Sequence, residues 1–191
     1  MTEEIPSNPH GHDQYGDTQY RFCPVCGHAL HTEVIKSCEP ERLVCNNCGF
    51  VFYLDPKLAV GTLVTLDSKI VLLRRGIEPA YGRWVFPGGY VNRGETVEEA
   101  SVRETREEVN LDVKIDKLLN VYSYPGRPVI VVVYAASVAG GELKAGDEAL
   151  EVEAFSPEDI PWRELAFPST RDALVEYVES YLGCKGKIPD F

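Results

Sequence analysis

Residues 89–111 read GYVNRGETVEEASVRETREEVNL, and this stretch decides the fold because it encodes one well-bounded helix. Thr96 and Glu99 have the spacing of a capping box, in which each side chain bonds the backbone N–H of the other at a helix start. Asn110 follows the last apolar position, where a residue in the left-handed conformation commonly closes a helix. The stretch therefore predicts a helix over 96–109.

Three glutamates of this predicted helix, Glu104, Glu107 and Glu108, are spaced i, i+3 and i+4 and share one face. Such like charges destabilise an isolated helix by roughly a few tenths of a kcal/mol per pair. A hard divalent cation such as Mg²⁺ takes carboxylate oxygens and reverses that sign. A solvated acidic face is the alternative explanation. The other face, which we expect to pack on a sheet, carries Val102, Thr105 and Val109.

Gly88 and Gly89 precede this helix, directly after the strand-like run 84–86. Without side chains, their backbone can approach a metal ion or a phosphate closely. A glycine loop followed by a carboxylate stripe favours a metal and phosphate site over a merely solvated helix face.

From Pro56 onward the chain alternates between strand-like and helix-like segments. A second helix is expected from Ser169 to about Leu182, ended by Gly183. Strands interleaved with only two substantial helices predict a mixed sheet packed between the helices. The run 129–134 is apolar throughout, which is typical of a strand buried on both faces. Five runs bounded by turn residues such as Asp67-Ser68 and Gly140-Gly141 are expected strands: 58–66, 70–74, 113–124, 128–136 and 149–155.

Four of the six cysteines fall in two Cys-x-x-Cys-Gly turns, Cys23 with Cys26 and Cys45 with Cys48. Each turn brings two thiolates to one cation, and four thiolates complete a closed, tetrahedral zinc site. Two disulfides or redox-active dithiols are the alternatives, and the doubled Cys-x-x-Cys-Gly pattern disfavours both. The remaining cysteines and the nearby histidines receive no ligand role: Cys38, Cys184, His28 and His31.

Composition divides the chain into a polar disordered tail (1–19), a zinc ribbon (20–55) and an α/β domain (56–191). The formal net charge of −11 disfavours non-specific binding to nucleic acid or to an anionic membrane. Metal ions between carboxylates and phosphates still allow an anionic substrate. No run approaches the roughly 20 apolar residues that span a bilayer. The N-terminus lacks signal-peptide features, so we expect a reducing, cytoplasmic compartment.

Residues 89–111 resemble the Nudix box: Gly, five residues, Glu, seven residues, Arg-Glu, apolar, any, Glu-Glu, any, Gly, apolar. Thr105 stands where an aliphatic residue is usual, and Asn110 where glycine is usual. Thr105 still presents a methyl group to the core, and asparagine tolerates the left-handed conformation. The matching residues are Gly89, Glu95, Arg103, Glu104, Glu107, Glu108 and Leu111.

The wider chain is similar to zinc-ribbon Nudix proteins of the NADH pyrophosphatase type and, more closely, to FAD and ADP-ribose pyrophosphohydrolases. The resemblance implies the Nudix fold, an α/β (α+β) arrangement with a mixed sheet sandwiched between helices, and a small N-terminal zinc ribbon. It implies hydrolysis of ADP-ribose, FAD or NADH-type compounds to AMP plus the other monophosphate. The segment 167–169 keeps only a Phe-Pro-Ser remnant of the NADH pyrophosphatase signature, which disfavours NADH.

The same resemblance implies that Glu104, Glu107 and Glu108 hold one to three Mg²⁺ or Mn²⁺ ions, helped by the Gly88 carbonyl. Arg103 would orient a glutamate, and Glu95 would support the loop–helix junction or the outer metal shell. The general base is Glu104 or a glutamate of the later segment 146–151. There we favour Glu148 over Glu151 because it lies on the loop side, with ordinary surface acids as the alternative. Candidate substrate contacts are Gly88, Gly89, Trp84 and Arg83, with Tyr81, Tyr122, Tyr124 and Phe167 as further aromatic candidates.

Two other functions are open. A non-catalytic Nudix sensor, with the ribbon contacting protein or nucleic acid, would be marked by a missing metal carboxylate, and none is missing. An enzyme for capped RNA or mutagenic nucleoside triphosphates is the second, and the absence of a basic groove disfavours long RNA. We expect a small nucleoside-diphosphate substrate, no membrane partner, and a homodimer on family resemblance alone.

Overall fold

The computed structural model describes residues 20–180. The tail expected over 1–19, Cys184 and the expected end of the second helix at Leu182–Gly183 lie outside the described residues. The chain divides between Pro56 and Lys57 into two compact units, which we call the N-terminal and C-terminal units.

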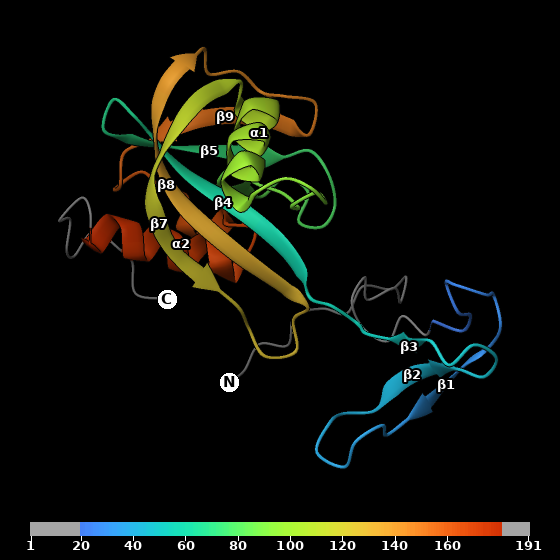
Figure 1. The fold of residues 1–191 in the computed structure, drawn as a ribbon. Coiled ribbons are helices and arrows are strands. Elements are labelled where there is room, and N and C mark those ends of the chain that lie inside the picture. Colours follow the sequence, from blue (N-terminus) through green and yellow to red (C-terminus); the bar gives the residue numbers. More distant parts are fainter. Residues whose placement is uncertain (1–19, 181–191) are drawn as a thin grey trace. The chain divides into compact units, whose positions relative to one another are not determined.

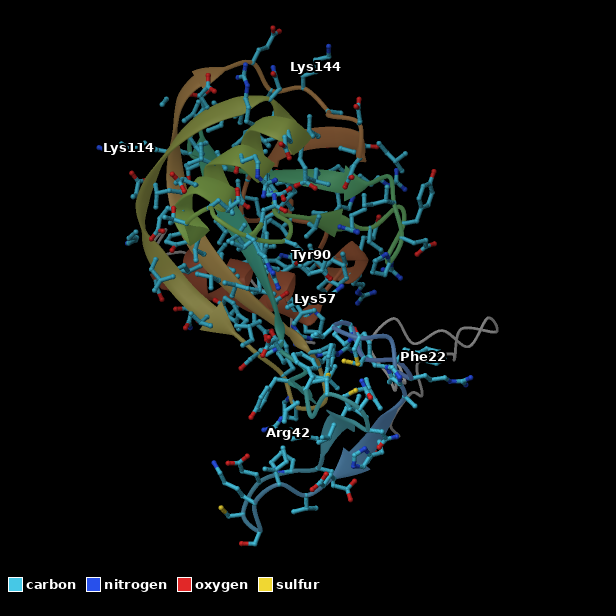
Figure 2. All side chains as sticks on the ribbon, turned by 45° about the vertical axis from the view of Figure 1, so that its right-hand side comes forward. Phe22, Arg42, Lys57, Tyr90, Lys114 and Lys144 are labelled. Atoms are coloured by element: carbon cyan, nitrogen blue, oxygen red, sulfur yellow. The ribbon has the colours of Figure 1, made fainter. Side chains whose placement is uncertain are left out.

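The N-terminal unit contains a three-stranded antiparallel sheet of β1 (Leu30–Glu33), β2 (Arg42–Cys45) and β3 (Val51–Phe52). Among its described residues, Cys23 and Cys45 are the buried ones. Phe22 is 67% exposed and projects from the surface of the ribbon (Figure 2). A unit this small, with so few buried apolar side chains, needs a cross-link or a metal to hold its fold.

The described part of the C-terminal unit contains a six-stranded sheet (Figure 1). Its path runs β6-β5-β4-β8-β7, and β9 pairs with β5. The β4–β8 pair is parallel and the other pairs are antiparallel, so the expected mixed sheet is confirmed. The strands are β4 (Lys57–Leu66), β5 (Lys69–Arg75), β6 (Trp84–Val85), β7 (Leu111–Tyr122), β8 (Val129–Gly141) and β9 (Ala149–Phe155).

The turn between β4 and β5 follows from its two residues. Asp67 and Ser68 have φ values of 49° and 65°, the left-handed region that a tight two-residue hairpin requires at both positions. The hairpin pairs Leu66 with Lys69, directly across the turn. The expected turn at Asp67-Ser68 is confirmed.

Helix α1 (Val97–Val109) begins and ends where the sequence predicts. The Glu99 N–H donates to Thr96 Oγ1 at 3.1 Å, and the Thr96 N–H donates to Glu99 Oε2 at 2.7 Å, so the capping box is complete. Asn110 closes the helix at φ 57°, ψ 30°. Local sequence alone therefore fixes both ends of this helix.

The sheet lies between α1 and α2 (Pro168–Ser180), which follows the short 3₁₀ helix η1 (Trp162–Glu164) (Figure 1). Thr62 of β4 bonds Ser101 of α1, at 2.5 Å between the two hydroxyl oxygens. Thr65 bonds the Tyr177 hydroxyl of α2 at 2.6 Å. Because residues separated by an odd number along a strand face opposite sides, these two contacts place the helices on opposite faces of the sheet.

The packing face of α1 differs from the expected one at a single position. Thr105 and Val109 are fully buried, but Val102 is 36% exposed. The buried face also includes Ser101 and Glu108. Residues at i, i+4 and i+7 share a helix face, so burial of residues 101, 105 and 108 turns Val102 toward solvent.

Strand β8 differs from the strand expected over 128–136. It extends to Gly141, and Gly140-Gly141, expected as a turn, pairs instead with Asp112 and Leu111 of β7. Its first four residues are half-buried rather than buried on both faces. These residues pair with the start of β4, and Figure 1 shows this end of the two strands beyond the N-terminal end of α1, so α1 does not cover it.

Candidate active site

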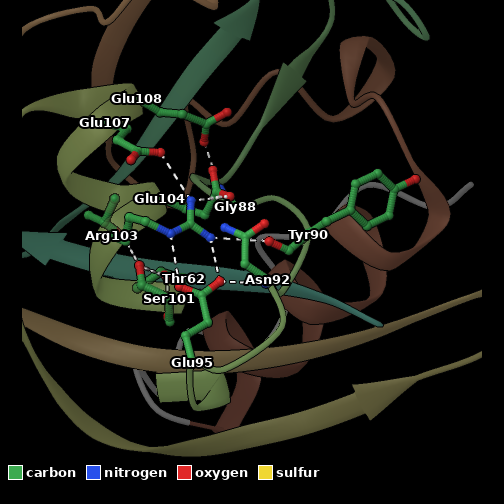
Figure 3. Close-up of polar contacts among 11 residues, drawn as sticks. Thr62, Gly88, Tyr90, Asn92, Glu95, Ser101, Arg103, Glu104, Glu107 and Glu108 are labelled. Carbon is green, nitrogen blue, oxygen red and sulfur yellow. Dashed lines mark hydrogen bonds and ion pairs between the residues drawn. The ribbon is translucent and has the colours of Figure 1, made fainter. Parts of the chain in front are cut away.

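Arg103 connects the loop before α1 to the carboxylates of the helix (Figure 3). Its Nε and Nη2 donate to Glu95 at 3.0 and 2.7 Å. Its Nη1 donates to Glu104 at 2.7 Å and to Glu107 at 3.0 Å. Its Nη2 also donates to the Tyr90 carbonyl at 3.2 Å. One guanidinium therefore fixes the loop–helix junction and two glutamates at once.

This network shifts the pKa values of Glu95 and Arg103 away from their ordinary values. The hydrogen bond from Arg103, followed by the backbone N–H of Asn92, lowers the pKa of Glu95 to about 2. The same bond to Glu95 is the main cause that raises the pKa of Arg103. Glu95 and Arg103 therefore remain charged throughout the physiological range.

Glu108 is the buried carboxylate of the site, 7% exposed. Its Oε2 accepts a hydrogen bond from the Gly88 N–H at 2.7 Å (Figure 3). Burial raises the pKa of Glu108 to about 8, and the charges of Glu104 and Glu148 add to that rise. A Cβ on Gly88 would clash with the carbonyl oxygen of Val60, so only glycine permits this approach of loop and strand.

Glu104 and Glu107 complete the carboxylate face of α1. Glu104 packs against the backbone of Gly89, and burial raises its pKa, with smaller contributions from the charges of Glu107 and Glu148. Glu107 is exposed. The three glutamates share one helix face but do not converge as closely as the cysteines do. In residues 20–180, the four cysteines alone form a group of metal-ligating atoms that all lie within 4.8 Å of one another.

The structure separates the two candidates of the later loop. Glu148 precedes β9, two residues after Gly146, whose N–H donates to the Glu108 carbonyl at 2.9 Å. The charge of Glu148 contributes to the raised pKa values of Glu104 and Glu108. Glu151 lies on β9 and forms an ion pair with Arg74 at 3.3 Å. The geometry thus favours Glu148 as a neighbour of the site.

Several expected substrate contacts have other partners. Trp84 is 6% exposed and packs edge-on against Phe155, with ring centroids 4.9 Å apart, so we correct its assignment to a packing residue. Arg83 donates to the Arg163 carbonyl at 2.9 Å. The hydroxyls of Tyr122 and Tyr124 donate to Glu176 and Asp172, which ties β7 and its following loop to α2. Tyr81 remains 57% exposed.

Arg75 is a candidate active-site residue that the sequence analysis did not identify. Its guanidinium lies 5.2 Å from the centroid of the Phe167 ring, and its charge lowers the pKa of Glu108. Its Nε donates to the Pro79 carbonyl at 2.8 Å, which fixes the side chain. The sequence feature that could have indicated Arg75 is the basic pair Arg74-Arg75 at the end of an apolar strand.

The four cysteines of the ribbon converge as predicted. The sulfur atoms of Cys23 and Cys48 are 3.7 Å apart, and that of Cys26 is 3.4 Å from those of Cys45 and Cys48. These separations are far longer than the S–S bond of a disulfide, about 2.05 Å. They fit four thiolates around one tetrahedral ion, for which a Zn–S bond of about 2.3 Å places sulfurs about 3.8 Å apart. Backbone N–H groups of Val25 and Asn47 point at two of the sulfurs, each at 3.4 Å.

The described helices include none that is both long and apolar enough to cross a membrane.

Comparison with known proteins agrees with both units. A family model described as NUDIX domain matches residues 55–177, and one described as Nudix N-terminal, a zinc ribbon, matches residues 21–54. The chain is 48% identical over 119 residues to the ADP-ribose pyrophosphatase of Methanocaldococcus jannaschii, covering 60% of this chain and 69% of that protein. It is 29% identical over 170 residues to the NAD-capped RNA hydrolase NudC of Stutzerimonas stutzeri, covering 86% of this chain and 57% of that protein.

Among solved structures, a NUDIX hydrolase from Nitrosomonas europaea superposes with a TM-score of 0.81 and 32% identity, covering 86% of this chain and 93% of that one. The chain spans little more than half the length of the NudC relative, so that protein's activity as a whole does not transfer directly. The chain belongs to the Nudix family of hydrolases, with a Nudix N-terminal zinc ribbon preceding its NUDIX domain.

Proposed function

We propose that this Nudix hydrolase cleaves the diphosphate of nucleoside-diphosphate-linked metabolites, with ADP-ribose and FAD ahead of NADH, releasing AMP and the other monophosphate. The observation that carries this proposal is the complete carboxylate face of α1, organised by Arg103 beside the Gly88–Gly89 loop. The likeness to an ADP-ribose pyrophosphatase supports the substrate class.

Glu104, Glu107 and Glu108 would hold the catalytic Mg²⁺ or Mn²⁺, because carboxylate oxygens are the ligands these hard cations prefer. When bound, such an ion supplies charge neutralisation at the diphosphate and a water of lowered pKa. Glu108 fits this role because burial and neighbouring carboxylates make its anion costly without a cation. Arg103 restrains Glu104 and Glu107 and keeps their oxygens on the same side of the helix.

Glu148 is our choice for the group that accepts the proton of the attacking water. Glu104, the alternative, is already engaged: Arg103 donates a charge-assisted hydrogen bond to its Oε1 at 2.7 Å, and its carboxylate would also be a metal ligand. Glu148 is exposed and lies close enough for its charge to act on two of the helix carboxylates. The attacking water would lie between Glu148 and the substrate phosphorus.

A product assay tests the enzyme and its substrate together. Purified protein with Mg²⁺ is incubated with ADP-ribose, FAD, NADH and a set of nucleoside triphosphates, and released AMP and monophosphates are separated and measured. The control is Glu108→Gln, which has nearly the same shape and should lower turnover by about 100-fold or more. AMP released from ADP-ribose or FAD, and lost in the control, supports the proposal. Tight binding of one compound with no turnover anywhere would instead identify a ligand sensor.

For the ribbon we propose a structural Zn²⁺ held by Cys23, Cys26, Cys45 and Cys48. The sulfur positions leave no open coordination position for a substrate. We accordingly propose residues 20–55 as the zinc ribbon and 56–191 as the hydrolase domain. Exposed Cys38 and a thiolate site both suit a reducing compartment, which supports a cytoplasmic location.

A further inference from the structure

The connection from β8 to β9, residues 142–148, is bonded to the C-terminal end of α1. The Lys144 N–H donates to the Val109 carbonyl at 3.1 Å, and the Gly146 N–H donates to the Glu108 carbonyl at 2.9 Å. The last carbonyls of a helix have no partner within the helix, so these bonds satisfy two of them. The connection therefore acts as a cap on the helix that bears the carboxylates.

Asn110 adds a side-chain bond to this cap. It stands at the Nudix-box position where glycine is usual, and its φ of 57° is one that glycine adopts without strain. Asparagine also tolerates this conformation, and its amide provides a donor that glycine lacks. Asn110 Nδ2 donates to the Glu142 carbonyl at 2.8 Å. The departure from the family pattern thus adds a hydrogen bond between the helix end and the connection.

The far end of the same connection leads to Glu148. The Gly76 N–H, at the end of β5, donates to the Glu148 carbonyl at 2.7 Å. A Cβ on Gly146 would clash with the Glu107 carbonyl oxygen, which shows how closely the connection packs on the helix. The backbone of Glu148 is thereby held between α1 and β5. The negative charge of its side chain contributes to the raised pKa values of Glu104 and Glu108.

We propose that Asn110 is a positioning residue: its amide holds the 142–148 connection on α1 so that Glu148 stays beside the helix carboxylates. This inference rests on the proposed function, in which Glu148 accepts the proton of the attacking water. Small displacements of a reacting group lower turnover strongly, about 100-fold for a shift near 1 Å. Loss of one of several bonds to the connection should have a smaller effect, mainly on kcat, because the Asn110 amide bonds the connection rather than a reacting group.

The test compares Asn110→Gly with Glu148→Gln and with the double variant, using whichever dinucleotide the full chain hydrolyses. Asn110→Gly restores the usual residue of the box and keeps the left-handed conformation, so the fold should persist. We expect kcat to fall about 10-fold, with KM within about 2-fold of wild type. Glu148→Gln should reduce kcat further, and adding Asn110→Gly to it should cause no additional loss, because the positioned group is already removed.

Arg106→Gln is the matched control. The Arg106 side chain bonds the Asn110 carbonyl at 3.3 Å and Asp112 at 3.2 Å, both outside the 142–148 connection. Its kcat should stay within about 2-fold of wild type. Hydrogen exchange supplies a readout independent of turnover: the amides of Lys144 and Gly146 should exchange faster in Asn110→Gly and at the wild-type rate in Arg106→Gln.

The outcomes separate the two proposals. Normal kcat and unchanged amide exchange in Asn110→Gly, alongside an impaired Glu148→Gln, would overturn the positioning role and leave the base assignment intact. Losses that multiply in the double variant would also overturn it, because Asn110 would then act independently of Glu148. Normal turnover in Glu148→Gln would refute the proposed base, and with it the positioning role.

Discussion

Arg103 holds two glutamates of α1 and one of the preceding loop with a single planar guanidinium. Its five donors point in fixed directions, so the contacts constrain one another. Lysine would keep the positive charge but present it as a compact ammonium that cannot span the same set of acceptors. The role of Arg103 in this site therefore depends on shape as well as on charge.

Arg103→Lys should lower kcat/KM by about 10- to 100-fold and raise the Mg²⁺ concentration needed for half-maximal turnover. The reason is that Glu104 and Glu107 lose their common anchor while the net charge is unchanged. Turnover is measured across a Mg²⁺ titration, with Arg93→Lys as the control because Arg93 is exposed in the same loop. An unchanged Mg²⁺ dependence in Arg103→Lys would show that charge alone suffices.

Glu108 makes the stability of the fold depend on pH, and the direction of that dependence follows from the pKa of Glu108. Burial raises the pKa of Glu108 to about 8 in the fold, against about 4.3 for an ordinary glutamate. The folded state therefore binds this proton more tightly than the unfolded chain does. In protein freed of Mg²⁺, the resulting stability is fully present below pH 4.3 or so and is lost as the pH rises to about 8.

The melting temperature of Mg²⁺-free protein should consequently fall by at least ~5 °C between about pH 5.5 and 8.5. In Glu108→Gln the fall should be clearly smaller, since the amide resembles the neutral acid and does not titrate. Thermal unfolding of both proteins at several pH values measures the difference. Equal slopes for the two proteins would mean that Glu108 does not determine the trend.

At the scale of elements, α1 and the loop before it are placed by close contacts with β4. The Val60 N–H donates to the Gly89 carbonyl and the Thr62 N–H to the Pro87 carbonyl, each at 2.8 Å. The buried Thr62 hydroxyl bonds Ser101 of α1. The loop thus continues the pairing of the strand, which brings the Gly88 N–H to the carboxylate of the helix.

Gly88→Ala should disrupt this arrangement, because its Cβ would clash with the Val60 carbonyl. We expect a loss of about 1–3 kcal/mol in the free energy of unfolding, together with a large loss of turnover. The matched control is Gly140→Ala, whose Cβ would meet its nearest atom, Asp112 Oδ2, at 3.4 Å, an ordinary contact. Chemical denaturation of both variants is the measurement, and equal stabilities would contradict the clash.

At the scale of the whole molecule, the two units are stabilised by different means. The C-terminal unit has a continuous apolar core that includes Leu63, Leu72 and Leu174. The N-terminal unit has few buried residues and a cluster of four thiols instead. Because metal binding in such small units supplies folding free energy, we expect the ribbon to depend on its ion.

Cys45→Ser should abolish zinc binding, seen as the loss of about one zinc per chain by elemental analysis. Amides of β1 and β2 should then lose protection from hydrogen exchange, whereas those of β4 and β8 should keep theirs. The control is Cys38→Ser, which removes an exposed thiol outside the cluster. Retention of zinc in Cys45→Ser, or loss of protection in β4 and β8, would contradict this independence.

The sequence was most informative where structure depends on neighbours along the chain. The capping box of Thr96 and Glu99, the left-handed Asn110 and the turn at Asp67-Ser68 are each set by contacts within a few residues. The two Cys-x-x-Cys turns belong to the same class, since in each turn a backbone N–H two residues along the chain donates to the first sulfur. Such features can be predicted because the interacting atoms are adjacent in the sequence.

The sequence was least informative where a side chain's partner is remote in the chain. Tyr122 and Tyr124 are candidate substrate contacts by sequence, and only the fold shows that their hydroxyls donate to acceptors of α2, 54 and 48 residues later. Arg75 carried no recognised role until the fold brought it near Glu108, and Trp84 proved to be a core residue beside Phe155. Nothing local distinguishes a packed aromatic ring from one that awaits a ligand.

The sequence by itself determined that this chain has a Nudix box on a capped helix, a four-cysteine ribbon and a mixed sheet between two helices. Tertiary structure decided which groups interact: the charge of Glu148 acts on Glu104 and Glu108, Glu151 pairs with Arg74, and the Asn110 amide donates to the Glu142 carbonyl. The division has a physical cause. Helix caps, turns and ligand spacing depend on short-range sterics and hydrogen bonds, whereas the contacts of a loop depend on the register of strands and helices that pack only in the folded chain.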